Sequence, residues 1–407
     1  MVCLLAISAW SPLSAFDLGG AAACVPATLS EAEASARDAY LEQALRDWQT
    51  PGMTIAVVQC DKPVLTKGYG VRKQGAPERV DEHTLFALGS TSKAFAAATV
   101  ALLVDDGALN WDDKVQRFLP WLEVYDPWVA RELNVRDLLT QRLGTSYRDE
   151  NLLRKGSKNA RDQLMRSRDL APVSPFRAGY VYSNNMFIAS GELVAAVSGQ
   201  PWTEFARERL WQPLGMSHTG ADSKVARAQP NAASPHAGRP GGPAAPIAWD
   251  YPDAVAVPSG GVNSNAVDVA QWLRFQLSEG AIGDRRLIDR GVFRQMHAPQ
   301  TAIPDPGAAP DVQTQFPDAA RNAGRMRFWS YGMGWYVTEY RGRTLVYHSG
   351  TIDGFRTGIG LLPEEGLAVY VNVNRVSRLP MALMLRLFDQ YLGETDADWS
   401  RLYLDDE

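Results

Sequence analysis

The sequence is poor in the residues that build metal sites and disulfide frameworks. Only three of its 407 residues are cysteine and five are histidine, and the histidines are scattered without the close spacing of metal ligands. We therefore expect no metal site, and a disulfide framework is improbable. The chain also lacks a basic surplus, because 41 Lys and Arg face 46 Asp and Glu, a formal net charge of -5. Nucleic acid is therefore not an expected partner.

Beyond the N-terminus, the chain has no apolar run long enough to span a bilayer. Residues 1–23 are mostly apolar, carry Asp17 as their one charge and end in three alanines before Cys24. This pattern predicts a bacterial export signal, although the basic residues that usually open one are missing. We expect an exported protein, periplasmic or secreted. A lipid anchor at Cys24 stays open, and in that case Cys60 would have no partner.

Strand patterns gather at the two ends of the chain. The composition is that of a globular protein with a large core, with 45% hydrophobic and 21% charged residues. An amphipathic helix over 29–48 is followed by a predicted hairpin of strands over 53–60 and 64–71. Near the C-terminus the predicted elements are strands over 334–339, 344–348, 357–362 and 367–373, and a helix over 380–392.

The middle of the chain is mostly helical in its periodicity. Predicted helical segments cover 135–140, 160–167, 186–198 and 202–211. Irregular stretches over 228–246 and 298–324 are rich in Pro, Ala and Gly, which is typical of lids and binding loops. We predict an α+β sheet domain from residues 24–108 and 252–407, a helical insertion domain over 109–251, and a cleft between them.

One Ser-x-x-Lys tetrad, Ser90-Thr91-Ser92-Lys93, follows Gly89 where a strand-like run passes into an apolar helical pattern. If the helix begins at Ser90, Lys93 lies one turn further along, where its amine can accept the Ser90 proton. A serine nucleophile needs such a base, together with donors for the oxyanion. Taken alone, the tetrad is also explained by a helix N-cap and a solvated lysine.

A second candidate, Tyr182-Ser183-Asn184, stands directly before the predicted helix over 186–198. In an extended segment Tyr182 and Asn184 point in the same direction, because side chains alternate along it. The free phenol has a pKa of about 10, so Tyr182 needs a nearby cation such as Lys93 to act as a base. A structural tyrosine and a helix-capping asparagine are the alternative. The similar Tyr370-Val371-Asn372 lies in an apolar strand and is better explained as core.

A third candidate, His348-Ser349-Gly350-Thr351, ends a predicted strand near the C-terminus. An edge strand with small residues could lay its backbone against a substrate, with Gly350 permitting close approach. The Thr351 amide would then point at a developing oxyanion, and the Ser90 amide would be the second donor. A strand-end histidine is also often just a satisfied polar residue.

These three elements, in this order, resemble the serine β-lactamase and penicillin-binding-protein superfamily, in particular its class C-like esterase, D-aminopeptidase and carboxypeptidase branch. The resemblance covers roughly residues 29–392 and includes Leu138-Leu139-Thr140, Ser259-Gly260-Gly261 and Tyr331-Gly332-Met333-Gly334-Trp335. It implies an α+β, β-lactamase-like fold, with a central antiparallel sheet flanked by helices and an inserted, mostly helical domain.

The resemblance also implies residue roles. Ser90 matches the nucleophile, Lys93 and Tyr182 the proton-transfer pair, and Asn184 the asparagine that binds the substrate amide. Substrate binding is further expected at His348, Ser349 and Gly350, and no cofactor is implied. The predicted activity is hydrolysis of an ester or peptide-like amide in a small molecule or short peptide, through an acyl-enzyme. An acyltransferase and a catalytically idle peptide-binding relative are the alternatives.

Two segments depart from the family pattern. Lactamases usually carry Lys-Thr-Gly where this chain has His348-Ser349-Gly350, and imidazole is often neutral. The loss of a permanent cation argues against efficient β-lactam hydrolysis. The segment Gln141-Arg142-Leu143-Gly144 replaces a His-x-Ser-Gly sequence and has no physical explanation at this level. The sequence leaves the substrate and the oligomeric state open.

Overall fold

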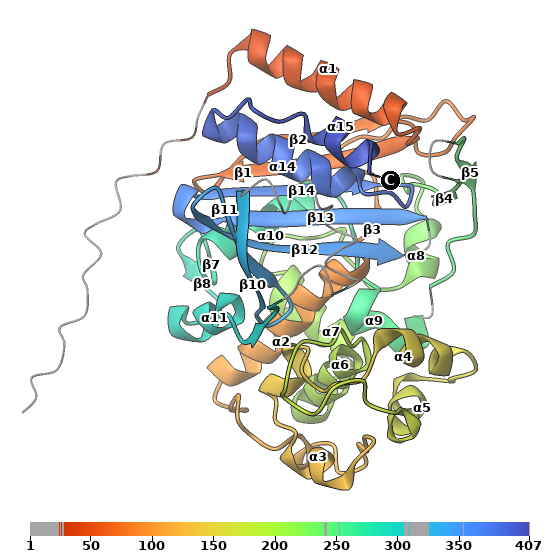
Figure 1. The fold of residues 1–407 in the computed structure, drawn as a ribbon, viewed down its shortest axis with the longest axis vertical. Helices are drawn as coiled ribbons and strands as arrows, with labels where there is room; N and C mark the ends of the chain where they lie inside the picture. The colour runs from red at the N-terminus through yellow and green to blue at the C-terminus, as the bar shows by residue number, and fades with distance from the viewer. Residues whose placement is uncertain are drawn as a thin grey trace, which may run out of the picture.

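The computed structural model describes residues 24, 26, 28–239, 242–251, 253–304, 309, 325–352 and 354–406. Its centre is an eight-stranded antiparallel sheet in the order β2-β1-β14-β13-β12-β11-β10-β9 (Figure 1). The strands are β1 (Gly52–Gln59), β2 (Lys62–Gly70), β9 (Thr301–Ala302), β10 (Met326–Tyr331), β11 (Tyr336–Tyr340), β12 (Arg343–Ile352), β13 (Phe355–Leu362) and β14 (Leu367–Val373). The predicted α+β class with a central antiparallel sheet is confirmed. The predicted signal segment, residues 1–23, lies outside the described residues.

The two ends of the chain meet inside the sheet. Strand β1 pairs with β14 in a register that sets Ile55 opposite Val371. Every residue of β1, β13 and β14 is buried, as expected of central strands with both faces covered. Helix α14 (Leu379–Leu392) packs against β13 and β14, and α10 (Ala266–Leu277) packs against β1, β2 and β14. Helix α1 (Glu31–Asp47) contacts β2 near the outer edge of the sheet.

The middle of the chain forms helices that lie beyond one edge of the sheet, next to α2 (Ser92–Asp105) in Figure 1. Helix α2 is apolar on all sides and almost wholly buried, because elements pack around its whole circumference. The other α-helices in the described part of the chain are α3 (Pro127–Glu132), α4 (Tyr147–Arg154), α5 (Ala160–Met165), α6 (Asn185–Ser198), α7 (Trp202–Ala206), α8 (Ser223–Arg227), α9 (Asp253–Gly260), α11 (Arg290–His297) and α15 (Trp399–Leu404). The division at residues 109–251 stays a prediction. None of the described helices is long and apolar enough to cross a membrane.

Local details differ from the prediction near the tetrad and at the third motif. The helix does not begin at Ser90: a 3-10 turn, η1 (Gly89–Thr91), comes first, and α2 starts at Ser92. Strand β12 is not an edge strand, since β11 and β13 flank it. Its pairing with β11 ends at Tyr347, however, so in the described pairings residues 348–352 are bonded to β13 alone. The expected open edge exists only along this final stretch.

A disulfide joins Cys24 to Cys60, so the expectation that a disulfide is improbable was wrong. The two cysteines are 36 positions apart and become neighbours, with Cα atoms 5.4 Å apart, only through the fold. Spacing alone therefore could not identify the pair. A sulfur bonded to Cys60 cannot also carry a thioether lipid, so this disulfide and a lipid anchor are exclusive uses of Cys24.

Candidate active site

Ser90 sits in the 3-10 turn η1, which is pressed against the end of β12. Gly89 has φ +56°, and a Cβ there would lie 2.8 Å from the Thr351 nitrogen. A Cβ on Gly350 would lie 2.0 Å from the Leu88 carbonyl oxygen. Only glycines allow this contact between the two backbones. The first and third sequence motifs therefore meet, with Ser90 partly exposed and Thr351 exposed beside it.

Lys93 is buried beneath Ser90 and has three oxygen neighbours. Its Nζ lies 3.1 Å from Ser90 Oγ, 2.8 Å from Asn184 Oδ1 and 2.7 Å from the Ser259 carbonyl oxygen. Both of the last two oxygens can only accept hydrogen bonds, so they take the two N–H groups of a neutral amine. Its lone pair is then left for the Ser90 hydroxyl. This arrangement suits a base that removes the Ser90 proton.

Burial decides the charge of Lys93. Loss of hydration lowers the pKa of its amine well below the usual 10.5, a shift that the Glu150 carboxylate opposes and the Arg154 guanidinium reinforces. A lowered pKa favours the neutral amine, which is the form that can accept a proton. The solvated first-turn lysine that the tetrad alone would allow is therefore excluded.

The second motif, Tyr182-Ser183-Asn184, also lies beside Lys93. Lys93 Nζ lies 4.8 Å from the centre of the Tyr182 ring, and that ring lies 6.3 Å from the His348 ring. Asn184 occupies the N-cap position of α6, yet its side chain makes no capping bond and instead accepts a hydrogen bond from Lys93. A purely capping role for Asn184 is therefore wrong. Tyr370, from the competing sequence match, is buried in β14 as predicted.

The carboxylate of Glu150, on α4, holds the tyrosine segment in place. It accepts hydrogen bonds from Ser183 Oγ (2.6 Å), the amide of Asn184 (2.6 Å), the amide of Asn185 (3.0 Å) and Thr145 Oγ1 (3.0 Å). Its side chain is fully buried, and burial raises its pKa while these four donors oppose the shift. Sequence reasoning missed Glu150, because a glutamate in a short amphipathic helix is normally solvated.

The departure at Gln141–Gly144 now has a physical explanation. Gln141 has φ +57°, its side-chain Oε1 accepts from the Ser183 amide (2.6 Å), and its carbonyl accepts from the Val181 amide (2.9 Å). The next residue, Arg142, accepts from the Arg177 amide through its carbonyl (2.8 Å). This stretch therefore runs beside residues 177–183 and supports the tyrosine segment.

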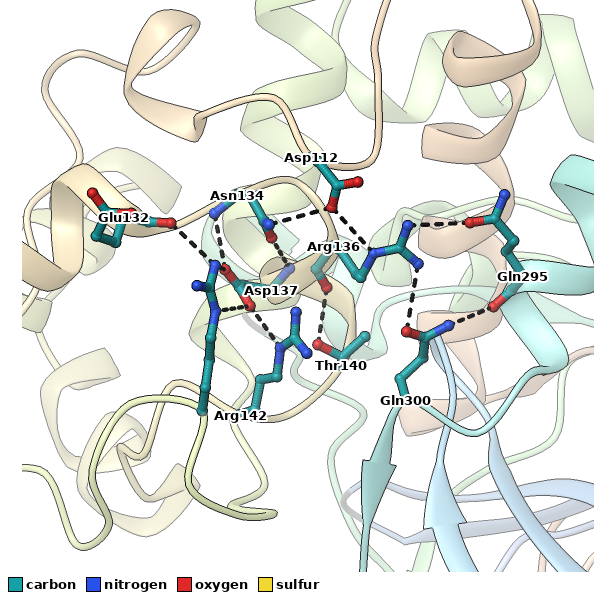
Figure 2. A network of polar contacts seen from close by, with 10 residues as sticks. Asp112, Glu132, Asn134, Arg136, Asp137, Thr140, Arg142, Gln295 and Gln300 are labelled. Carbon is teal, nitrogen blue, oxygen red and sulfur yellow. Dashed lines mark hydrogen bonds and ion pairs between the residues drawn. The ribbon is translucent and has the colours of Figure 1, made fainter. Parts of the chain in front are cut away.

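A polar network anchors the same region from outside (Figure 2). Asp137 is fully buried and accepts from Arg142 Nε (2.6 Å) and Arg177 Nε (3.0 Å). Its neighbour Arg136 reaches the other way, to Asp112 and to two glutamines near α11. Figure 2 shows the two groups of contacts side by side on one turn of chain. Asp137 thereby connects the stretch that contains Arg142 to the stretch that contains Arg177, which leads into the tyrosine segment.

His348 lines the site as a neutral ring. Its Nδ1 lies 2.6 Å from the Ser349 carbonyl oxygen, to which it donates, and its Nε2 accepts from the Tyr331 hydroxyl (3.2 Å). Burial and the proximity of Lys93 lower the pKa of His348 to about 3. The ring thus supplies no permanent cation, and both its nitrogens contact protein atoms. A direct part of His348 in substrate binding stays a prediction.

A cavity of about 800 Å³ opens above these residues. Its lining includes Ser90, Tyr147, Asn151, Arg154, Tyr182, Asn184, Asp250, Tyr251, Ser259, Tyr336, His348, Ser349, Thr351, Arg356, Val376, Ser377 and Arg378. Every predicted site residue except Gly350 therefore lines this cavity or lies directly beneath it. Gly350 does not line the cavity, because it packs against the Leu88 backbone.

The sheet built from both chain ends, with a buried lysine under a serine in the turn that leads into α2, is the arrangement of the penicillin-binding-protein fold. The sequence profile named Beta-lactamase matches residues 37–391, and the chain belongs to this family. A solved structure described as the octameric penicillin-binding protein homologue from Pyrococcus abyssi superposes with a TM-score of 0.76 at 20% identity. It covers 89% of this chain and 78% of that one, which shows a shared fold. The family resemblance drawn from the three motifs is confirmed.

Three curated relatives are between 24% and 29% identical to this chain. Unguisins hydrolase ungD' of Aspergillus campestris is 29% identical over 90% of this chain, and ungD of Aspergillus violaceofuscus is 28% identical over 91%. Protein flp of Staphylococcus aureus is 24% identical over 83% of this chain. The chain spans 67% of each Aspergillus protein and 62% of flp, about two thirds of these relatives' length.

Proposed function

We propose that this beta-lactamase-family hydrolase cleaves an ester or a peptide-like amide bond through an acyl-enzyme on Ser90. The main support is the 3.1 Å contact between Ser90 Oγ and the buried Lys93 amine. The other two neighbours of this amine, Asn184 Oδ1 and the Ser259 carbonyl oxygen, can only accept hydrogen bonds. Nucleophile and base are thus paired without any further group. Names of two relatives as unguisins hydrolases support a hydrolytic reaction.

Acylation begins when Lys93 takes the Ser90 proton and Ser90 Oγ attacks the carbonyl carbon. The backbone amides of Ser90 and Thr351, on the two segments pressed together at Gly89, receive the oxyanion. The bond to the leaving group then breaks, and Tyr182 passes a proton to the departing oxygen or nitrogen. Water attacks the acyl carbon in the second half and gives a proton to the Tyr182 phenolate. The bond to Ser90 then breaks, and the serine regains the proton that Lys93 took. Asn184 orients the substrate amide from the opposite wall.

Peptide-like substrates suit the size of the cleft, since about 800 Å³ holds a ligand larger than a simple acetyl ester. Efficient β-lactam hydrolysis is not proposed. A neutral His348 with a pKa of about 3 cannot hold a carboxylate as the lactamase lysine does.

Export from the cytoplasm is part of the proposal. A disulfide between Cys24 and Cys60 supports it, because disulfides persist mainly in oxidising compartments.

A substrate panel tests the proposal directly. Short-chain p-nitrophenyl esters, D-amino-acid amides, D-Ala-D-Ala peptides and nitrocefin are compared between the wild type and Ser90→Ala. We expect hydrolysis of at least one ester or amide and a loss of about 10³-fold or more in kcat in the variant. Turnover that survives Ser90→Ala would reject the assignment. Product analysis with an added alcohol or amine separates hydrolysis from acyl transfer.

A further inference from the structure

The cleft carries positive charge in an acidic protein. The chain has a formal net charge of -5, yet Arg154, Arg356 and Arg378 line the cavity beside Ser90. Asp250 is the acidic residue among the described lining residues, and its exposed side chain lies 4.0 Å from Arg227 outside the cavity. Clefts lined by one sign of charge concentrate ligands of the opposite sign. The cleft therefore favours anionic substrates.

Two of the three arginines already have protein partners. Arg356 donates to Thr351 Oγ1, across the β12–β13 pair. Arg378 donates to Asp406 Oδ2 (2.7 Å) and to the Asp406 carbonyl oxygen (2.8 Å). The guanidinium of Arg154, in contrast, has no hydrogen bond or ion pair with any residue of the described chain. Its side chain is partly buried. A guanidinium that lines a cavity without a protein counter-ion can pair with an anionic group of a ligand.

Helix α4 presents Arg154 as part of a continuous face. Tyr147, Asn151 and Arg154 are spaced i, i+4 and i+7, so they lie on one side of the helix, and all three line the cavity. The Tyr147 ring packs edge-on against the Tyr182 ring at 5.7 Å. The electrostatic effect of Arg154 reaches Lys93 and Tyr251, both at the base of the cleft. Because Arg154 and Ser90 line the same cavity of about 800 Å³, one ligand can contact both.

We propose that the substrate carries a carboxylate, which Arg154 binds as an ion pair on the α4 face while Ser90 attacks an ester or amide bond elsewhere in the molecule. This inference rests on the proposed function. A planar guanidinium matches a carboxylate in a two-bond geometry, so an ion pair at Arg154 gives orientation as well as affinity. The carboxylate is on the acyl part or on the leaving group.

Matched substrates test the inference and distinguish the two positions. Mono-4-nitrophenyl glutarate is compared with its neutral methyl ester for the acyl side, and 3-acetoxybenzoate with its methyl ester for the leaving-group side. The readout is the ratio of kcat/KM for the anionic substrate to that for its neutral partner. We expect one of the two ratios to exceed unity and to fall by about 10- to 100-fold in Arg154→Gln.

Arg168→Gln is the matched control variant. It removes the same charge from the helical region, but Arg168 is half-exposed, pairs with Glu123 at 3.0 Å and does not contribute to the described cavity lining. The ratio should stay at its wild-type value in this control. Charge reversal in Arg154→Glu should invert the preference, so that a cationic acyl ester is favoured over a neutral one. Fluorophosphonate labelling of each variant verifies that Ser90 is still reactive.

Each outcome decides a different claim. A ratio near unity in the wild type, or one unchanged by Arg154→Gln, overturns the carboxylate inference while Ser90-dependent turnover of the neutral esters upholds the proposed function. If no substrate of either pair, and none of the wider panel, is turned over by a folded protein, the proposed function fails and the inference falls with it.

Discussion

The two segments that meet at the candidate active site are held by different forces. The Ser90 turn is fixed by contact between backbones, because Gly89 and Gly350 leave no room for a side chain between η1 and β12. The Tyr182 segment is fixed by polar bonds instead, from the buried carboxylate of Glu150 and the side chain of Gln141. Steric contact tolerates no added atom, whereas a polar anchor depends on the charge and geometry of a few groups. We therefore expect the Ser90 turn to be sensitive to an added methyl group at a glycine. The Tyr182 segment should instead be sensitive to the loss of a charge or a hydrogen bond.

The largest effect is expected from Gly350→Ala. The new Cβ would lie 2.0 Å from the Leu88 carbonyl oxygen and must push β12 away from the Ser90 turn. Displacing the Thr351 amide from the oxyanion should lower kcat by about 10² to 10³-fold. The control is Gly179→Ala on the tyrosine segment, where a Cβ meets no atom within 4 Å. Equal activity in the two variants, measured on the same ester, would show that the contact between the two backbones does not hold Ser90 in position.

Glu150→Gln should have the next largest effect. The amide keeps one acceptor oxygen but turns an NH₂ group toward donors, so the Tyr182 segment loses part of its anchor. We expect kcat/KM for a neutral ester to fall by about 10- to 100-fold, the value of a lost hydrogen bond to a charged group. Asp149→Asn, an exposed neighbour on α4, is the control and should behave as the wild type. Wild-type rates in Glu150→Gln would show that Glu150 does not hold the Tyr182 segment in its active position.

Opposite shifts of the pH profile sharpen the comparison further. Lys93 must be neutral to act as a base, so kcat/KM should fall as the pH drops through the Lys93 pKa, which burial places well below 10.5. Glu150→Gln removes a negative charge that favours protonated Lys93, which lowers that pKa and moves the acidic limb to lower pH. Arg154→Gln removes a positive charge, which raises the pKa and moves the limb to higher pH. Shifts in the same direction would contradict this electrostatic picture.

The smallest effect on turnover is expected for Asp137→Asn, which acts on the outer network of Figure 2. Arg142 and Arg177 lose their shared carboxylate, and the free energy of unfolding should fall by about 1 to 3 kcal/mol. Urea denaturation measures this change, and activity should fall less than in Glu150→Gln. Asp112→Asn, whose side chain is 75% exposed, is the control and should change stability by less than about 0.5 kcal/mol. Equal losses of unfolding free energy in the two variants would show that Asp137 does not anchor this region.

Sequence patterns predicted the elements whose periodicity is strong and the residues whose types are needed by the chemistry. Ser90, Lys93 and Tyr182 were predicted to lie together because three short motifs occur in one chain, and the structure brings them within contact distance. Their catalytic roles stay a prediction. The 3-10 turn at Gly89 could not be predicted, since it depends on the contact with Thr351, more than 250 positions later. Glu150 and Arg154 were missed for a related reason. Whether a charged residue on a short helix faces solvent or a cleft is decided by tertiary packing, not by local periodicity.

The claim on which the rest depends is that Ser90, activated by Lys93, becomes covalently acylated. Incubation with a fluorophosphonate probe, followed by mass mapping of the labelled peptide, tests it most directly. We expect one label on Ser90, no label in Ser90→Ala and strongly slowed labelling in Lys93→Met. A label on another residue, or undiminished labelling of the folded Ser90→Ala variant, would contradict it.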